Sequence, residues 1–321
     1  MFDSDHSTKH IIQSLVVNVV LAVAKLGAAL FTGSGAMMAE AIHTFADCGN
    51  QILLLRGVKE GRRPPDASHP LGYGRTVYFW SFMVALLLFT GGGVFSIYEG
   101  IHHFQHPSAV ENVGVAIGIL GFSFVLEGWA TFGNIKELNA RRGSTGFFRF
   151  LQTTKDSDLV VIFGENAAAV LGLLFALIAV GLAMATGDAR FDALGSLAVG
   201  IILVGVAIFL ATEVKSLLVG EAADPIINQH VEETARLHPR IEKVLACITM
   251  QQGPGEVIVA VKLKMVEGLS GAEMVQAINE FEVELQTRRP EIKWSFVEPD
   301  DSDDDIHPKK PSAPSPTHAS A

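Results

Sequence analysis

A stretch of apolar sequence near the N-terminus, residues 36–56, is interrupted by polar side chains, each of which after the first lies three or four residues beyond an earlier one. That spacing places all of them on one face of a helix: Glu40, His43, Asp47, Asn50 and Gln51. His43 and Asp47 are four residues apart, so an imidazole nitrogen and a carboxylate can point at the same position. Such a pair is half of a site for a divalent transition-metal ion such as Zn²⁺. The alternative is structural, with both groups forming hydrogen bonds between helices.

A second apolar segment, residues 159–185, adds another carboxylate. Glu165 and Asn166 are followed by a face of small residues that permits a neighbouring helix to approach closely: Ala167, Ala168, Ala169 and Gly172. Asp47 and Glu165 lie at comparable depths from the charged ends of their segments. A site made of His43, Asp47 and Glu165 would leave one coordination position open, which suits an ion that is exchanged.

The other ionisable residues of the apolar segments also need an explanation, because charges inside a bilayer are costly and mark function or pairing. Lys25 and Glu40 lie at similar depths in successive segments, and we expect them to neutralise each other in a structural role. Glu127 has no evident partner in the sequence. It either carries a proton or forms a hydrogen bond with Glu165 or Asn166.

Polar residues also flank the third and sixth apolar segments. His102, His103 and His106 follow the third segment, where they either collect or release a metal ion or are ordinary interfacial side chains. Asp192 lies at the entry to the sixth segment and is expected to cap a helix or to lie at the interface, with a gating role as the weaker alternative.

The elements that position these residues follow from the composition. The chain has 321 residues, of which 49% are hydrophobic and 18% are charged, against about 25% charged in a soluble domain. Apolar runs of spanning length predict a polytopic α-helical membrane protein with six transmembrane helices, at about residues 11–31, 36–56, 77–98, 113–133, 159–185 and 191–211.

Basic residues in the short connections predict the orientation of these spans. Ten Lys and Arg residues lie in the connections after the second and fourth spans, whereas the other three connections contain only Arg190. Since positive charge stays on the cytosolic side, we expect both termini in the cytosol. Short loops and the absence of a targeting extension favour a bacterial inner membrane.

The C-terminal part of the chain has a different composition. Of the net charge of −10, residues 213–321 contribute −8. Residues 213–298 predict a cytosolic α+β domain of αββαβ, ferredoxin-like order, in which two helices (224–237 and 270–288) cover one face of an antiparallel sheet (244–251, 257–266 and 293–297). Residues 1–212 would then form the transport domain, and residues 299–321 an acidic and then Pro/Ser/Ala-rich disordered tail.

Several classes of function lack support in the sequence. No basic patch suggests nucleic-acid binding, and no nucleophile elbow or cofactor motif suggests an enzyme or a prosthetic group. The alternative that stays open is a membrane-anchored interaction protein whose intramembrane polar groups only hold helices together.

Several segments together resemble the cation diffusion facilitators. They are residues 40–47 (EAIHTFAD), the loop 69–75 (HPLGYGR), residues 164–169 (GENAAA) and residues 218–224 (LVGEAAD). The resemblance covers about residues 9–298. It implies a homodimeric carrier, joined through the cytosolic domain, that exports Zn²⁺ or a similar divalent ion from the cytosol in exchange for protons.

The resemblance also implies which residues bind the ion. The family places four ligands between its second and fifth helices, and His43, Asp47 and Glu165 occupy three of those positions. The fourth, commonly a histidine, falls on Val161. The missing ligand leaves Mn²⁺, Co²⁺, Ni²⁺ or Fe²⁺ as alternatives to Zn²⁺, with Asn166, Glu127 and Asn50 as candidate accessory residues. The family's additional zinc sites in the cytosolic domain are not expected, because the matching positions hold Val261 and Glu298, and His230 and His238 are too far apart.

Overall fold

The computed structural model describes residues 4–107 and 110–301. The chain divides into two compact units, one ending at Val219 and the next beginning at Gly220. The last helix of the first unit continues to Val219, past the predicted domain boundary at residue 212. Most of the predicted tail, residues 302–321, lies outside the described residues.

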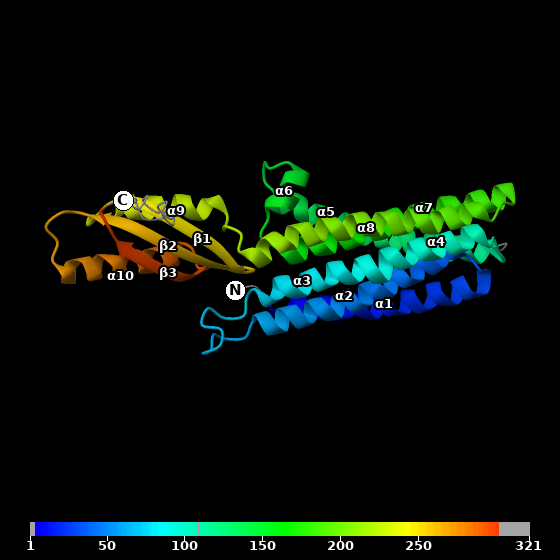
Figure 1. The fold of residues 1–321 in the computed structure, drawn as a ribbon, viewed down its shortest axis with the longest axis horizontal. Coiled ribbons are helices and arrows are strands. Elements are labelled where there is room, and N and C mark those ends of the chain that lie inside the picture. The colour runs from blue at the N-terminus through cyan, green and yellow to red at the C-terminus, as the bar shows by residue number, and fades with distance from the viewer. Residues whose placement is uncertain (1–3, 108–109, 302–321) are drawn as a thin grey trace, which may run out of the picture. The chain divides into compact units, whose positions relative to one another are not determined.

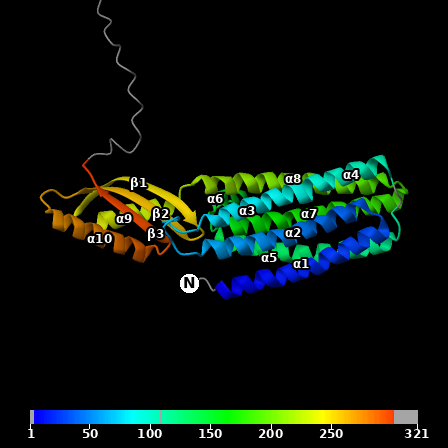
Figure 2. The same cartoon turned by 60° about the horizontal axis from the view of Figure 1, so that its bottom comes forward.

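The first unit is built from helices, and the long ones run side by side (Figures 1 and 2). In chain order the elements are α1 (Ser4–Thr32), α2 (Gly35–Gly61), α3 (Thr76–Leu87), η1 (Leu88–Val94), α4 (Phe95–Gln105), α5 (Val113–Arg141), α6 (Phe147–Thr153), α7 (Ser157–Thr186) and α8 (Arg190–Val219). The predicted third span is α3, η1 and α4 together, because a π-helical turn at η1 interrupts an otherwise continuous rod.

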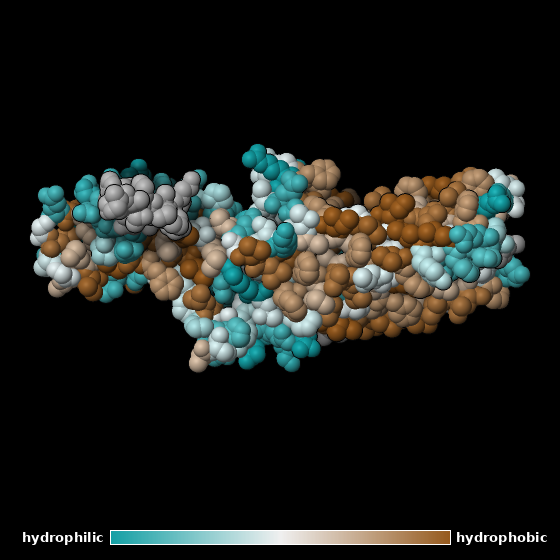
Figure 3. All heavy atoms as spheres, in the orientation of Figure 1, coloured by the Kyte–Doolittle hydropathy of each residue, from teal (hydrophilic) through white to brown (hydrophobic). Residues whose placement is uncertain are grey.

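Among the described residues of this unit, five helical segments are long and apolar enough to cross a membrane: residues 15–32 of α1, the rod from Thr76 to Gln105, α5, residues 159–186 of α7, and α8. Figure 3 shows hydrophobic side chains along the middle of the unit and hydrophilic ones gathered toward its ends. α2 is 27 residues long but is not among the five, since its polar stripe lowers its hydropathy. A sixth span at α2 therefore stays a prediction.

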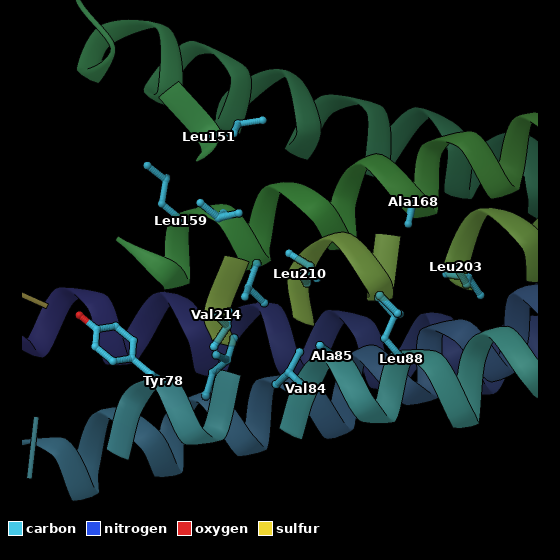
Figure 4. Close-up of a cluster of buried hydrophobic side chains, with 14 of the residues drawn as sticks. Tyr78, Val84, Ala85, Leu88, Leu151, Leu159, Ala168, Leu203, Leu210 and Val214 are labelled. Carbon is cyan, nitrogen blue, oxygen red and sulfur yellow. The ribbon is translucent and has the colours of Figure 1, made fainter. Parts of the chain in front are cut away.

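The helices pack around a buried apolar cluster drawn from α2, α3, η1, α5, α6, α7 and α8, and Figure 4 labels part of it. Tyr78, Leu88 and Leu210 are among its largest fully buried members. In a bilayer the lipid tails are as apolar as these side chains, so close packing rather than water exclusion holds such helices together.

α4 and α8 approach each other closely at two glycines. A Cβ on Gly100 would lie 2.8 Å from the backbone nitrogen of Leu197, and one on Gly200 would lie 2.7 Å from the backbone nitrogen of Ile97. Ser196 on α8 donates a hydrogen bond to the Ser96 carbonyl at 3.2 Å across the same contact. Only glycine leaves room for backbones at this separation.

The second unit contains α9 (Pro225–Leu237), β1 (Ile241–Gly253), β2 (Glu256–Met265), α10 (Gly271–Arg288) and β3 (Ile292–Pro299). Both helix starts follow the sequence prediction. The Asp224 carboxylate accepts from the Ile226 amide at 2.9 Å, ahead of Pro225 in the first turn. Ser270 and Glu273 form a reciprocal capping box at the start of α10.

The sheet differs from the prediction in the direction of its last strand. The strand order is β1-β2-β3, with β1 and β2 antiparallel and β2 and β3 parallel. The expectation of a wholly antiparallel sheet is wrong because α10 carries the chain back along the sheet before β3 begins, as in a β-α-β crossover. Both helices cover the face that carries Val257, Val259, Val261 and Leu263.

Candidate functional site

The polar stripe of α2 lies inside the helical unit. Glu40, His43 and Asn50 are fully buried, and Asp47 is 8% exposed. α2 begins at Gly35 with Ser34 as its cap, whose hydroxyl accepts from the Met37 amide at 3.1 Å. Helical periodicity then brings each member of the stripe to the same interior face, as the sequence predicts.

α7 is one of the helices that this stripe faces. A Cβ on Gly172 would lie 2.5 Å from Glu40 Oε1, so this glycine makes room for the carboxylate. Asp47 follows Glu40 by seven residues on α2, and Glu165 precedes Gly172 by seven residues on α7. Asp47 and Glu165 are in electrostatic range of each other. Asn50 also lies close enough for its amide to interact with Glu165. The small-residue face predicted for α7 therefore does bring Glu165 beside α2.

Several buried polar atoms at this contact have no hydrogen-bond partner among the described residues: both ring nitrogens of His43, Oδ1 of Asp47 and Oε1 of Glu165. His43 Nδ1 and Asp47 Oδ1 are 3.6 Å apart, which is beyond a normal hydrogen bond. Leaving such groups unsatisfied costs about 1–3 kcal/mol each. An imidazole and two carboxylates with lone pairs that accept no hydrogen bond are the donor set of a divalent-metal site.

These donors are not assembled around one point in this conformation. Across the described part of the chain, no group of three or more His, Cys, Asp or Glu side chains is arranged to hold a metal ion. Val161, one turn before Glu165, is fully buried in the apolar cluster and offers no ligand. Asn166 is half-buried, and its backbone carbonyl accepts from the Thr131 hydroxyl at 3.3 Å.

A second set of buried polar groups lies beside the first and is paired. Lys25 Nζ is 3.3 Å from Glu40 Oε2 and 2.9 Å from Thr44 Oγ1, which confirms the expected neutralisation of Lys25 by Glu40. Lys25 is also 3.7 Å from Glu127 Oε1. Glu127 therefore has an ion-pair partner on α1, a contact that neither of the two sequence alternatives, carrying a proton or bonding to Glu165 or Asn166, had named.

One sequence expectation was that Asp192 caps a helix. It does so, but the helix that it caps is α2 and not α8, on which it lies. Its carboxylate accepts from the Ser34 hydroxyl and from the Gly35 amide, both at 2.6 Å. The negative charge lies where the α2 dipole is positive. Asp192 thus holds α8 against the start of the helix that carries His43 and Asp47.

The three histidines near this end do not form a metal cluster with one another. His103 Nε2 is 3.1 Å from Glu99 Oε1, and its ring packs over Gly35. The rings of His102 and His106 lie with their centroids 5.1 Å apart. Pairing of His103 with Glu99 favours the interpretation that these are interfacial side chains.

The two histidines among the described residues of the second unit are engaged with other groups. His230 Nδ1 is 2.8 Å from the Ile226 carbonyl, and His238 Nε2 is 3.3 Å from Glu280 Oε2. Val261 is buried in the core, and Glu298 lies 3.6 Å from Lys262 Nζ. No metal-binding cluster is present in the described residues of this unit.

Two contributors to the site were missed by sequence reasoning. Thr44, next to His43, binds Lys25, and Gly172 accommodates Glu40. Glu40 and Thr44 are four residues apart and so lie on one helical face. That spacing could have indicated that Thr44, like Glu40, contacts Lys25. Nothing in the sequence relates Gly172 to Glu40, because that contact depends on how α2 and α7 pack.

The helical unit matches a known protein family. Residues 11–219 match the family described as the cation efflux transmembrane domain. The chain is 34% identical over 238 residues to a Xenopus laevis protein named proton-coupled zinc antiporter SLC30A9, mitochondrial; the match covers 74% of this chain and 43% of that protein. For the human protein of the same name the identity is 32% over 251 residues, covering 78% and 44%.

A plant protein is related at a similar level. Metal tolerance protein C4 of Arabidopsis thaliana is 30% identical over 256 residues, covering 79% of this chain and 56% of that protein. The matched region is thus about half the length of each of these curated relatives.

Proposed function

The chain belongs to the cation diffusion facilitator family, and from that premise we propose that it is a membrane carrier that exports a divalent transition-metal ion from the cytosol. Zn²⁺ is the favoured cargo, and protons are the counter-ion. His43, Asp47 and Glu165 are the proposed ligands. The ion is a substrate, and the carrier moves it without converting it chemically.

One observation carries this proposal: the unpaired polar atoms of His43, Asp47 and Glu165, buried where α2 meets α7. Buried lone pairs without partners are expensive, and a cation that they share would satisfy them together. A purely structural role for the stripe would pair these atoms within the protein, as happens where Lys25 donates to Glu40 Oε2 and to Thr44.

The proposed mechanism is alternating access. An ion entering from the cytosol draws the two carboxylates and the imidazole together, because its charge offsets their mutual repulsion. Movement of the helices then opens the site to the opposite side. Metal ligands must be deprotonated to bind, so protons arriving from that side compete for the ligands and release the ion.

The identity of the ion follows from the ligand set only in part. Two carboxylates and one imidazole, with apolar Val161 at the fourth position, select less strongly for Zn²⁺ than a histidine-rich site, since oxygen ligands also suit Mn²⁺ and similar ions. The printed names of the SLC30A9 relatives support Zn²⁺ with proton exchange. Co²⁺, Ni²⁺ and Fe²⁺ are the remaining alternatives.

We propose further that the carrier is a homodimer joined through its C-terminal unit, with six spans and both termini in the cytosol. The resemblance to the family and the ten basic residues of the even-numbered connections support this arrangement. A bacterial inner membrane stays the sequence-based prediction, while the SLC30A9 relatives are named as mitochondrial. Light scattering of the purified protein in detergent measures whether it is a dimer.

The test of the transport proposal is metal movement in proteoliposomes. The purified chain is reconstituted with a metal-sensitive dye in the lumen, and Zn²⁺ is added outside. Asp47→Ala is expected to abolish dye response, whereas the matched control Glu137→Gln, at the exposed end of α5, should retain it. Full flux in Asp47→Ala would disprove the ligand assignment.

Calorimetry separates the carrier from the alternative, a membrane-anchored interaction protein. Titration with Zn²⁺, Mn²⁺, Co²⁺, Ni²⁺ and Fe²⁺ in turn should give one preferred ion. Glu165→Ala should weaken its binding by about 100-fold or more, because outer-shell residues of metal sites already contribute about 10- to 100-fold. An interaction protein would bind none of these ions, although its stability would still depend on His43.

A further inference from the structure

We propose that Lys25, Glu40 and Glu127 form a proton-binding site, separate from the metal ligands, that carries a counter-proton of the exchange. The inference rests on the proposed transport function and assigns the proton a place of its own. The juxtaposition of one ammonium group with two carboxylates inside the helical unit is what points to it.

The three charged groups come from three different helices. Lys25 lies on α1, Glu40 on α2 and Glu127 on α5, and the ammonium nitrogen lies 3.3 Å and 3.7 Å from the two carboxylates. Lys25 and Glu40 are fully buried, and the Glu127 side chain is 12% exposed. Thr44 takes another hydrogen bond from Lys25 at 2.9 Å.

The charge of this cluster does not balance when every group is ionised. One ammonium and two carboxylates leave a net charge of one negative unit in an interior where uncompensated charge is costly. One added proton makes the cluster neutral. The cluster therefore has two accessible states, differing by a single proton, and the less charged state is the one that burial favours.

The structure leaves an acceptor for that proton. Glu40 Oε2 faces Lys25, while Glu40 Oε1 is buried with no hydrogen-bond partner among the described residues. Gly172 leaves space against this oxygen, where a Cβ would come within 2.5 Å. A hydroxyl at Glu40 or at Glu127 would retain the ion pair of Lys25 with the other carboxylate.

The cluster is placed to sense the metal ligands. Asp47 lies in electrostatic range of Glu127, Lys25 and Glu40, and His43 in range of Lys25. Among the described residues, His43 and Asp47 on α2 are therefore titratable groups that face the cluster, and Glu165 on α7 is in electrostatic range of Asp47. A divalent ion bound there repels the cluster's proton, and by reciprocity the proton weakens metal binding.

The step conserves charge and atoms. With metal bound, the proton leaves one carboxyl group of the cluster to water on the cytosolic side, and the carboxylate stays paired with Lys25. After the metal is released on the other side, a carboxylate takes a proton from water there. One proton thus moves in the direction opposite to the ion in each cycle.

The experiment counts protons against metal ions. Proteoliposomes of the full chain carry a pH dye and a metal dye in the lumen, and Zn²⁺ is added outside with and without an opposing pH gradient. Glu127→Gln is expected to move metal while its proton-to-metal ratio falls by one proton per ion and acceleration by the gradient is lost. Glu127→Asp should restore both, and Glu137→Gln on the same helix should match the wild type.

The outcomes separate this inference from the proposed function. A wild-type chain that moves no metal overturns both. An unchanged ratio and unchanged gradient response in Glu127→Gln overturn the proton site alone.

Infrared spectroscopy decides the case in which Glu127→Gln stops metal movement. Zn²⁺ added to the wild type is expected to remove a protonated-carboxyl band, and part of that change should be missing in Glu127→Gln or Glu40→Gln. The same band change in both variants would overturn the inference.

Discussion

Two sets of buried polar groups meet on α2, and they differ in whether they are satisfied. Toward the start of the helix, Glu40 and Thr44 both contact Lys25. Interleaved with them and one turn further along, His43 and Asp47 keep polar atoms without partners. The burial of the two sets is the same, so burial alone does not identify a binding site. What distinguishes the proposed metal site is that His43, Asp47 and Glu165 each keep an unpartnered atom, whereas in the Lys25 set a single atom, Glu40 Oε1, does so among the described residues.

Removing the cation of the paired set should have the largest effect on stability. Lys25→Met leaves two buried carboxylates without their counter-charge, and we expect a loss of about 3–5 kcal/mol in the free energy of unfolding. Thermal unfolding in detergent measures it. A change within experimental error would show that the pairing does not stabilise the helices and would remove the contrast with the unpaired set.

The unpaired set should respond to metal instead. His43→Leu removes two unsatisfied nitrogens without leaving a large cavity, so its stability without metal should stay near that of the wild type. Added Zn²⁺ should stabilise the wild type by about 2.7 kcal/mol at a hundred times its Kd and His43→Leu by much less. Melting curves with and without metal test this, and equal stabilisation of both proteins would exclude His43 as a ligand.

Asp192 offers a paired group at the end of α2, away from either set. Asp192→Ala should lower the free energy of unfolding by about 2 kcal/mol, because hydrogen bonds from the Ser34 hydroxyl and the Gly35 amide to a charged acceptor are lost. Hydrogen exchange of the first turn of α2 should rise with it. The exposed Glu111→Ala serves as the control, and an equal effect there would argue against a specific role.

The capping box of α10 should show the smallest effect, since its polar groups are paired but exposed. Ser270→Ala is expected to cost about 1 kcal/mol, seen as faster hydrogen exchange in the first turn of α10. Hydrogen bonds from the Ser270 amide and hydroxyl lower the pKa of Glu273. The stabilisation is therefore present above the pKa that Glu273 has in the unfolded chain, and it is lost as the pH falls through the lowered folded value.

An outcome in which Ser270→Ala abolished the pH dependence without altering exchange would contradict this explanation. A loss in the free energy of unfolding as large in Ser270→Ala as in Lys25→Met would also contradict the difference between buried and exposed pairs. Water replaces lost hydrogen bonds at an exposed site and cannot do so in the interior.

The sequence by itself determined the features that depend on neighbours a few residues apart. The i, i+4 spacing of His43 and Asp47, the cap at Asp224 and the capping box at Ser270 all follow from helical geometry and occur as predicted. The apolar runs likewise predicted the long helices. Such features need only the local backbone, which the sequence of each segment sets.

Only the tertiary structure decided the contacts between segments. Lys25 meets Glu127 102 residues away, Asp192 reaches Ser34 across 158 residues, and β3 pairs in parallel because α10 reverses the chain. A buried charge must pair with an opposite charge or a hydrogen-bond donor, but the sequence alone offers several candidate partners and does not rank them. Helix packing selects among these candidates. It pairs Glu127 with Lys25, and it leaves polar atoms of His43, Asp47 and Glu165 without a hydrogen-bond partner among the described residues.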